Sequence, residues 1–75
     1  MILNGHTIEP GADLSNAKLS GANLTNVDLR AVTLAGAGLR KVELSGRSMT
    51  GADLHRADLS SVNLAGANLF GAIMP

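Results

Sequence analysis

His6 and His55 are the side chains of this sequence best suited to acid–base catalysis or metal binding. His6 has only Glu9 close to it in the sequence, whereas a metal site needs three or four ligands. His55 lies near Asp53 and Arg56, but no nucleophile, base and orienting group come together around it. The chain has no cysteine, which excludes disulfides and thiolate zinc sites. We therefore expect a protein without catalytic residues, bound metal or cofactor.

The overall charge of the chain also excludes several classes of partner. Six basic and six acidic residues cancel in a chain of 75, and Phe70 is the only aromatic residue. Nucleic-acid binding uses a basic surface and often stacking aromatic side chains. No apolar stretch reaches the roughly 20 residues that cross a bilayer, and MILNGHTIEP does not resemble a secretory signal. We expect a cytoplasmic protein that binds neither nucleic acid nor membrane.

Leucine recurs at every fifth position, and this regularity must reflect how the chain is built. A small apolar residue stands two positions before each leucine, except where Arg47 precedes Met49. Met74 continues the series at its end. We interpret its earlier members as the structural core: Leu14, Leu19, Leu24, Leu29, Leu34, Leu39, Leu44, Met49, Leu54, Leu59, Leu64 and Leu69.

A helix cannot use a period of five, because each leucine would be rotated ~140° from the last. In an extended segment, residues two apart share a face, so the small residue and the leucine both point inward. The remaining steps require a turn, and glycine or asparagine (including Asn16 and Asn26) often stands two places after the leucine. The chain should therefore wind into a coil whose turns stack by parallel ladders ~4.8 Å apart.

Charge placement indicates four segments in each coil. With three segments, Asp13, Asp28, Glu43 and Asp58 would stack in one column, which is destabilising. With five segments, Asp28 would lie over Asp53. With four, residues twenty apart are neighbours and no like charges coincide.

The segments GADLSNAKLSGANL and GADLHRADLSSVNLAGANL resemble the pentapeptide-repeat family, whose motif is A(D/N)LXX, and the resemblance covers residues 12–75. It implies an all-β fold, a right-handed quadrilateral parallel β-helix, here of about three coils. The sequence departs from the motif at the outward position, where Asp or Asn is usual, and we expect these departures to alter the surface rather than the fold. The departing residues are Lys18, Thr33, Gly38, Glu43, Ser48 and Ile73.

Two parts of the chain can be separated. Residues 1–11 form an N-terminal lead-in, and residues 12–75 form the β-helix. Leu3 and Ile8 keep the spacing of five but lie one residue out of register with Leu14, so we expect residues 2–8 to cover the open end of the first coil. The alternative is a disordered terminus.

Basic residues gather on one predicted face. Lys18, Arg40 and Lys41 fall on the second face of the coil, and Arg56 stands at the corner that leads into it. These residues are either scattered solubilising charge or contacts for an acidic protein partner.

Arg47 occupies an inward position without an acid near it. Because an unpaired buried charge is costly, its side chain must leave the core by a local twist or by snorkelling. Arg47 is either a tolerated defect or a further partner contact.

The C-terminal segment NLFGAIMP concentrates apolar residues where the last coil exposes its ladder groups. We predict an end-to-end homodimer through residues 69–75, with Phe70, Ile73 and Met74 as contacts.

We interpret the protein as a non-enzymatic structural or protein-interaction module. Some family members protect DNA gyrase by imitating duplex DNA, which the resemblance makes an alternative. That role requires an acidic rod, whereas this chain is neutral. A second alternative is a fragment of a longer solenoid.

Overall fold

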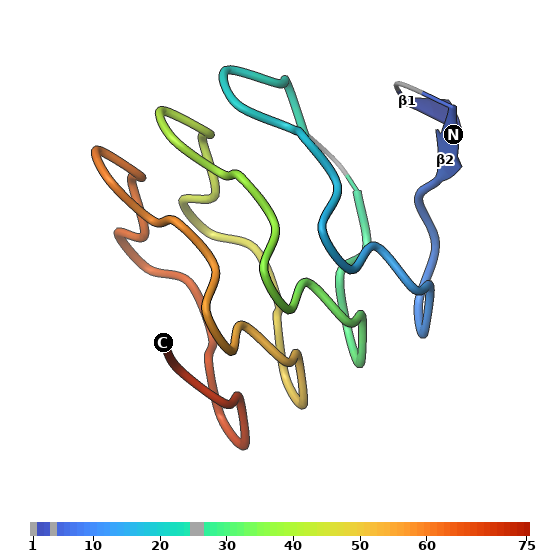
Figure 1. Ribbon diagram of the computed structural model, residues 1–75. Coiled ribbons are helices and arrows are strands. Elements are labelled where there is room, and N and C mark those ends of the chain that lie inside the picture. Colours follow the sequence, from blue (N-terminus) through green and yellow to red (C-terminus); the bar gives the residue numbers. More distant parts are fainter. Residues whose placement is uncertain (1, 4, 25–26) are drawn as a thin grey trace.

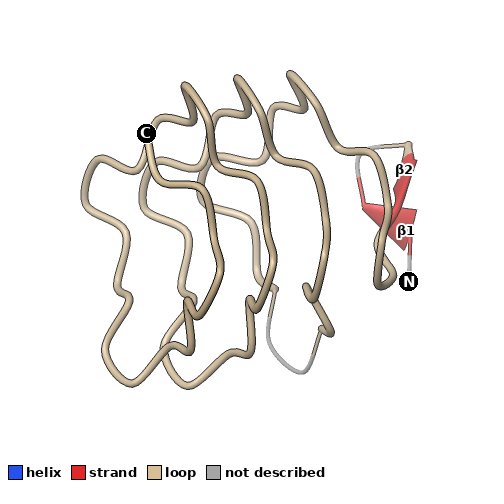
Figure 2. Cartoon of the chain, turned by 90° about the horizontal axis from the view of Figure 1, so that it is seen from below, coloured by secondary structure: helices blue, strands red, loops and turns tan. Residues whose placement is uncertain are grey.

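The computed structural model describes residues 2–3, 5–24 and 27–75, and it shows a chain that winds into a stack of coils (Figure 1). The formal strands are β1 (Ile2–Leu3) and β2 (His6–Thr7). They pair antiparallel, with Ile2 opposite Thr7 and Leu3 opposite His6. This hairpin lies at one end of the stack, and the C-terminus lies at the other (Figures 1 and 2).

The coils are joined by parallel bridges between residues twenty apart. One column runs from Asp13 through Thr33 and Asp53 to Ile73. A backbone hydrogen bond from Leu14 N to the carbonyl of Thr33 (2.7 Å) is typical of these rungs. An offset of twenty with a period of five gives four walls per coil, so the four-sided prediction is confirmed. Coil one comprises residues 12–31, coil two 32–51 and coil three 52–71, while residues 72–75 begin a fourth coil.

Each wall is short because a turn follows every leucine. The leucine carbonyl accepts a hydrogen bond from the amide three residues later, as from Ala17 N to Leu14 O at 3.0 Å. Only one residue per wall is then left for bridging, so Figure 2 draws nearly all of the chain outside the hairpin as loop. Every described residue two places after the leucine has a positive φ, between 59° and 72°. This conformation at the third residue is that of a type II turn.

The positive φ is independent of residue type. Glycine and Asn16 occupy this place as predicted, whereas Asn26 lies outside the described residues. Four further residues, which do not favour this conformation, adopt it as well. They are Ala31, Lys41, Arg56 and Ser61, with φ between 59° and 63°.

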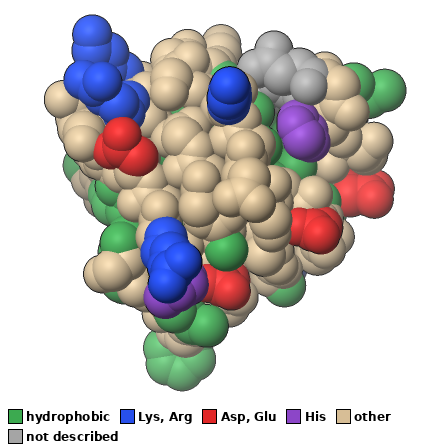
Figure 3. Space-filling view, in the orientation of Figure 1, with side chains coloured by type: hydrophobic (Ala, Val, Ile, Leu, Met, Phe, Trp, Pro, Cys, Tyr) green, Lys and Arg blue, Asp and Glu red, His purple; other side chains and the backbone are tan. Residues whose placement is uncertain are grey.

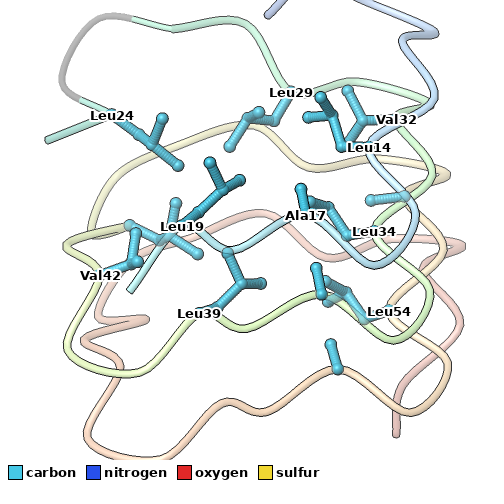
Figure 4. Close-up of a cluster of buried hydrophobic side chains, with 14 of the residues drawn as sticks. Leu14, Ala17, Leu19, Leu24, Leu29, Val32, Leu34, Leu39, Val42 and Leu54 are labelled. Carbon is cyan, nitrogen blue, oxygen red and sulfur yellow. The ribbon is translucent and has the colours of Figure 1, made fainter. Parts of the chain in front are cut away.

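The core lies inside the four walls, where the leucines of successive segments meet (Figure 4). Nine of the twelve residues predicted to form the core, from Leu14 to Leu54, are at most 1% exposed. Leu59, Leu64 and Leu69 are partly buried and pack against this cluster, because no further coil covers them. Ile8 is also buried in it, which places the end of the lead-in against coil one.

The ladder between coils one and two is interrupted over two walls. One rung joins Gly21 N to the Arg40 carbonyl at 2.8 Å, and another joins Ala31 N to the Thr50 carbonyl at 2.9 Å. Between these rungs, Ala22, Leu24 and residues 27–30 form no ladder hydrogen bond to coil two. We call this interruption the ladder gap.

The same two walls of coil two pair normally with coil three. Leu44 N donates to the carbonyl of Asn63 at 3.0 Å, and Met49 N donates to that of Asn68 at 2.8 Å. The ladder gap therefore lies between coils one and two and does not extend to coil three. Arg47 lies on the coil-two side of the gap.

Candidate functional site

The outward acidic side chains serve the turns of the β-helix. Asp13 Oδ1 accepts hydrogen bonds from the Ser15 amide (3.1 Å) and the Ser15 hydroxyl (2.7 Å). Asp58 does the same with Ser60, at 3.0 and 2.6 Å. Asp53 and the outward asparagines 63 and 68 each accept from the amide two residues later. This is the Asx-turn contact, in which a short polar side chain replaces a missing backbone partner.

The fold is kept at the outward departures, which still form bridges between coils, but these contacts show that the departures also change the hydrogen bonding of the turns. Gly38 and Ile73 carry no side-chain acceptor, so their turns lack a hydrogen bond that the motif residue would supply. Glu43 keeps the contact, since its carboxylate accepts from the amide (3.1 Å) and the hydroxyl of Ser45. The outward position therefore contributes to turn stability as well as to the surface.

The same contacts lower the pKa of the carboxylates. For Asp13, Asp58 and Glu43, the main cause is the side-chain hydrogen bond from the following serine, and the amide hydrogen bond adds to it. For Asp28, the main cause is the side-chain hydrogen bonding of Arg30. Hydrogen bonding to the charged form favours that form.

The basic residues predicted as partner contacts do not form a single site. Arg40 and Lys41 line a shallow depression of about 300 Å³ together with Ser20 and Gly21. Arg56 stands at a different corner, in the column of Asn16 rather than that of Lys41. In Figure 3, Lys and Arg side chains appear as separate groups with polar and acidic surface between them.

Arg47 keeps the backbone of the repeat although its side chain does not fit the repeat. Its amide closes the turn onto Leu44 O at 3.2 Å, and its carbonyl accepts from Asn68 N at 2.9 Å. Its segment therefore has no local twist on the side of coil three, and the flexible side chain itself reaches partly out of the core. The side chain is partly exposed while its Nε stays buried, so the structure shows neither a twist toward coil three nor a guanidinium that lies fully in solvent.

The guanidinium of Arg47 lies beside the ladder gap. Its Nε is buried without a hydrogen-bond partner. A depression of about 390 Å³ opens there. Its lining residues are Val27, Asp28, Arg30, Gly46, Arg47 and Ser48.

Sequence reasoning missed the other charged members of this depression. Arg30 Nε donates to both carboxylate oxygens of Asp28, at 2.9 and 3.0 Å, and its Nη2 donates to Oδ2 at 2.5 Å. The two residues are separated by a single leucine, so the spacing D-x-R at a turn was the available signal. Because the carboxylate of Asp28 forms an ion pair with Arg30, it does not pair with Arg47.

Three large apolar residues near the C-terminal end are exposed. Phe70 is 83% exposed, Ile73 55% and Met74 45%. Among the described residues, Ile2 at the opposite end is the one other large hydrophobic side chain that is as exposed, at 74%. The C-terminal coil edge is therefore the main apolar surface of the described chain.

The described residues also lack two other features. They contain no group of three or more His, Cys, Asp or Glu side chains arranged to hold a metal ion. They also contain no helix long and apolar enough to span a membrane.

The geometry defines a class of protein: a four-sided solenoid whose walls are single-residue bridges between turns. The family described as Pentapeptide repeats matches this sequence in eight copies over residues 11–46 and 39–74. Comparison with curated protein sequences gives no match.

Two solved structures share the architecture. One is HetL, a pentapeptide repeat protein involved in heterocyst differentiation regulation in the cyanobacterium Nostoc sp. strain PCC 7120. It is 32% identical, with a TM-score of 0.73 over 84% of this chain and 34% of its own. The other is a pentapeptide repeat protein from the Arabidopsis thaliana thylakoid lumen, 36% identical, with a TM-score of 0.50 over 91% of this chain and 57% of its own.

The chain belongs to the pentapeptide-repeat protein family. Its fold is the right-handed quadrilateral β-helix of that family, as the resemblance in the sequence predicted. The chain spans about a third of the length of HetL and somewhat over half of that of the Arabidopsis protein.

Proposed function

We propose that this protein is a non-enzymatic interaction module that binds a second copy of itself through the edge of its last coil. The observation that carries the proposal is the exposure of three large apolar residues within the last six positions: Phe70, Ile73 and Met74. Exposed apolar patches of this kind are typical of protein-binding surfaces. On the walls of the described chain, the other large apolar residues are buried or partly buried.

The backbone of the last coil supports the same proposal. In coil two, the amides of Leu39, Leu44 and Met49 all donate to carbonyls of coil three. The corresponding amides of coil three, those of Leu59, Leu64 and Leu69, donate to no backbone carbonyl of the described residues. An edge of unpaired ladder groups beside apolar side chains favours pairing with another chain.

The test is the oligomeric state of the 75-residue chain. We expect sedimentation velocity at tens of micromolar to show a dimer, and Phe70→Lys to show a monomer that is less stable than the parent. Ile2→Lys is the matched control, because Ile2 is comparably exposed at the opposite end; it should leave the dimer intact. A monomeric parent would overturn the proposal and favour the alternative of a fragment from a longer solenoid.

The DNA-mimic alternative has no observation in its favour. Its acidic surface would need free carboxylates, whereas those of Asp13, Asp28 and Asp58 are hydrogen-bonded to their own turns. A gyrase supercoiling assay tests it directly. Unchanged supercoiling at high protein concentration would remove this alternative without affecting the proposed dimer.

A further inference from the structure

The depression at the ladder gap combines several hydrogen-bond donors that the fold leaves unused. Arg47 Nε is buried and has no acceptor. The Ser48 amide would donate to the carbonyl of Val27 if the ladder were continuous, but that rung is absent among the described residues. Both donors belong to residues that line the depression.

The charge of the depression is positive. Its lining holds two guanidinium groups, Arg30 and Arg47, and one carboxylate, Asp28, which leaves one net positive charge. Asp28 is held by Arg30 through three side-chain hydrogen bonds, so the uncompensated charge is that of Arg47. The charge of Arg47 also contributes to the lowered pKa of Glu43, but the carboxylate of Glu43 is hydrogen-bonded to Ser45 and Asn63.

An unpaired Nε–H and a neighbouring amide suit an anion with oxygen acceptors. An arginine offers Nε and one terminal nitrogen side by side to two oxygens of a carboxylate or phosphate. The stem of Arg47 is flexible, and no acceptor within the described chain holds its Nε. Rotation of this stem can therefore present the Nε–H to the depression.

We propose that the ladder gap is a binding site for a small oxyanion, with Arg47 as its main ligand and the Ser48 amide as a second donor. The hydroxyl of Ser48 is a third donor beside them, and Arg30 contributes long-range attraction. This site lies on the walls between coils one and two, apart from the C-terminal edge used for the proposed dimer. It therefore goes beyond the proposed function and does not depend on it.

The test uses the side-chain Nε–H resonance of Arg47 in ¹H–¹⁵N correlation spectra of the whole chain. Inorganic phosphate and acetate are titrated separately, each against sodium chloride at equal ionic strength. We expect the Arg47 Nε–H and Ser48 amide signals to shift and saturate together, with a dissociation constant on the order of 1 mM. Which of the two anions saturates identifies the preferred oxyanion.

Two variants separate specific binding from general attraction to positive charge. Arg47→Lys keeps the charge but lacks the side-by-side nitrogens, and it should lose the saturating shift of the Ser48 amide. Arg40→Gln, which removes an arginine from a different depression, should leave the shift unchanged. Shifts that do not saturate, that match the chloride series or that persist in Arg47→Lys would overturn the proposal.

Discussion

At the scale of the single residue, Arg47 is the departure from the small apolar series, and unpaired hydrogen-bonding groups lie beside it. A small apolar side chain at this place would pack between Val27 and Ala67 of the same column. In the structure the Arg47 side chain is partly exposed, its buried Nε stays unpaired, and the adjoining rungs toward coil one are missing. A buried donor without a partner costs about 1–3 kcal/mol. The expected loss of stability is therefore located at Arg47 and the ladder gap.

Arg47→Ala should stabilise the fold by about 1 kcal/mol, because it removes the unpaired donor and restores the repeat. Urea unfolding of parent and variant measures the difference. The amides of Leu29 and Ser48 should also exchange more slowly with solvent once the rungs reform. A lower stability of the variant would show that Arg47 has an internal partner. A more stable variant that no longer binds an oxyanion would place Arg47 among residues that trade stability for function.

The third residue of each turn offers a second comparison between single residues. Ala31 adopts a φ of 59°, a conformation that costs an L-residue about 1–2 kcal/mol. Gly46 occupies the equivalent place, and a Cβ added there would meet nothing within 4 Å. Ala31→Gly should therefore stabilise the protein by about 0.5 kcal/mol, since the gain is reduced by the backbone entropy of glycine. Gly46→Ala should destabilise it by about 1 kcal/mol, and thermal unfolding of both variants checks the opposite signs.

At the scale of the element, each turn depends on its outward side chain. The carboxylates of Asp13, Asp28, Glu43 and Asp58 have lowered pKa values in the folded state. A lowered pKa means that the folded state binds the proton less readily than the unfolded chain does. The stabilisation is therefore complete above the ordinary carboxyl range of about 4 and is lost as the pH falls through it.

Urea unfolding should accordingly give a lower midpoint at pH 3 than at pH 7. Asp58→Asn is an informative variant, because Asn63 and Asn68 make the same amide contact without a charge. It should keep most of the stability at pH 7 and reduce the loss on acidification. An equal midpoint at both pH values would contradict the role assigned to the carboxylates.

The extent to which the sequence predicted the structure differs between elements. The period of five and the alternation of inward and outward residues predicted the walls, because both follow from the geometry of short extended segments. Charge columns predicted the offset of twenty that the bridge from Asp13 to Thr33 shows. The positive φ of Lys41 and Arg56 was not predictable from residue type, since the fold imposes it at every corner.

The candidate site was predicted only in part. Arg47 was identified because it breaks a series, but the break in the series did not predict the ladder gap beside it. That outcome is decided by packing between residues twenty apart, and no local pattern encodes it. The pairing of Asp28 with Arg30 removes the acid that could have neutralised Arg47, and this too is a matter of side-chain geometry.

At the scale of the whole molecule, the chain is a short column in which each coil contacts only its neighbours. Stability in such a solenoid is close to a sum of coil and interface contributions. Coil two is paired on both sides along walls one and two, whereas Ile8 of the lead-in packs against the core and coil three carries an edge of unpaired amides. The two ends of the column therefore differ in chemistry, with a hairpin at one and exposed Phe70 at the other.

The offset of twenty between stacked residues also constrains how this gene can change in length. Duplication of a twenty-residue stretch adds one coil and returns every later residue to its own column. Insertion of five residues keeps the core alternation intact but carries everything downstream a quarter-turn around the axis, so that Phe70 would move from the fourth wall to the first. Insertion of a single five-residue repeat would therefore rotate the C-terminal surface around the axis relative to the ladder gap. Duplication of a whole coil would only increase the distance between them.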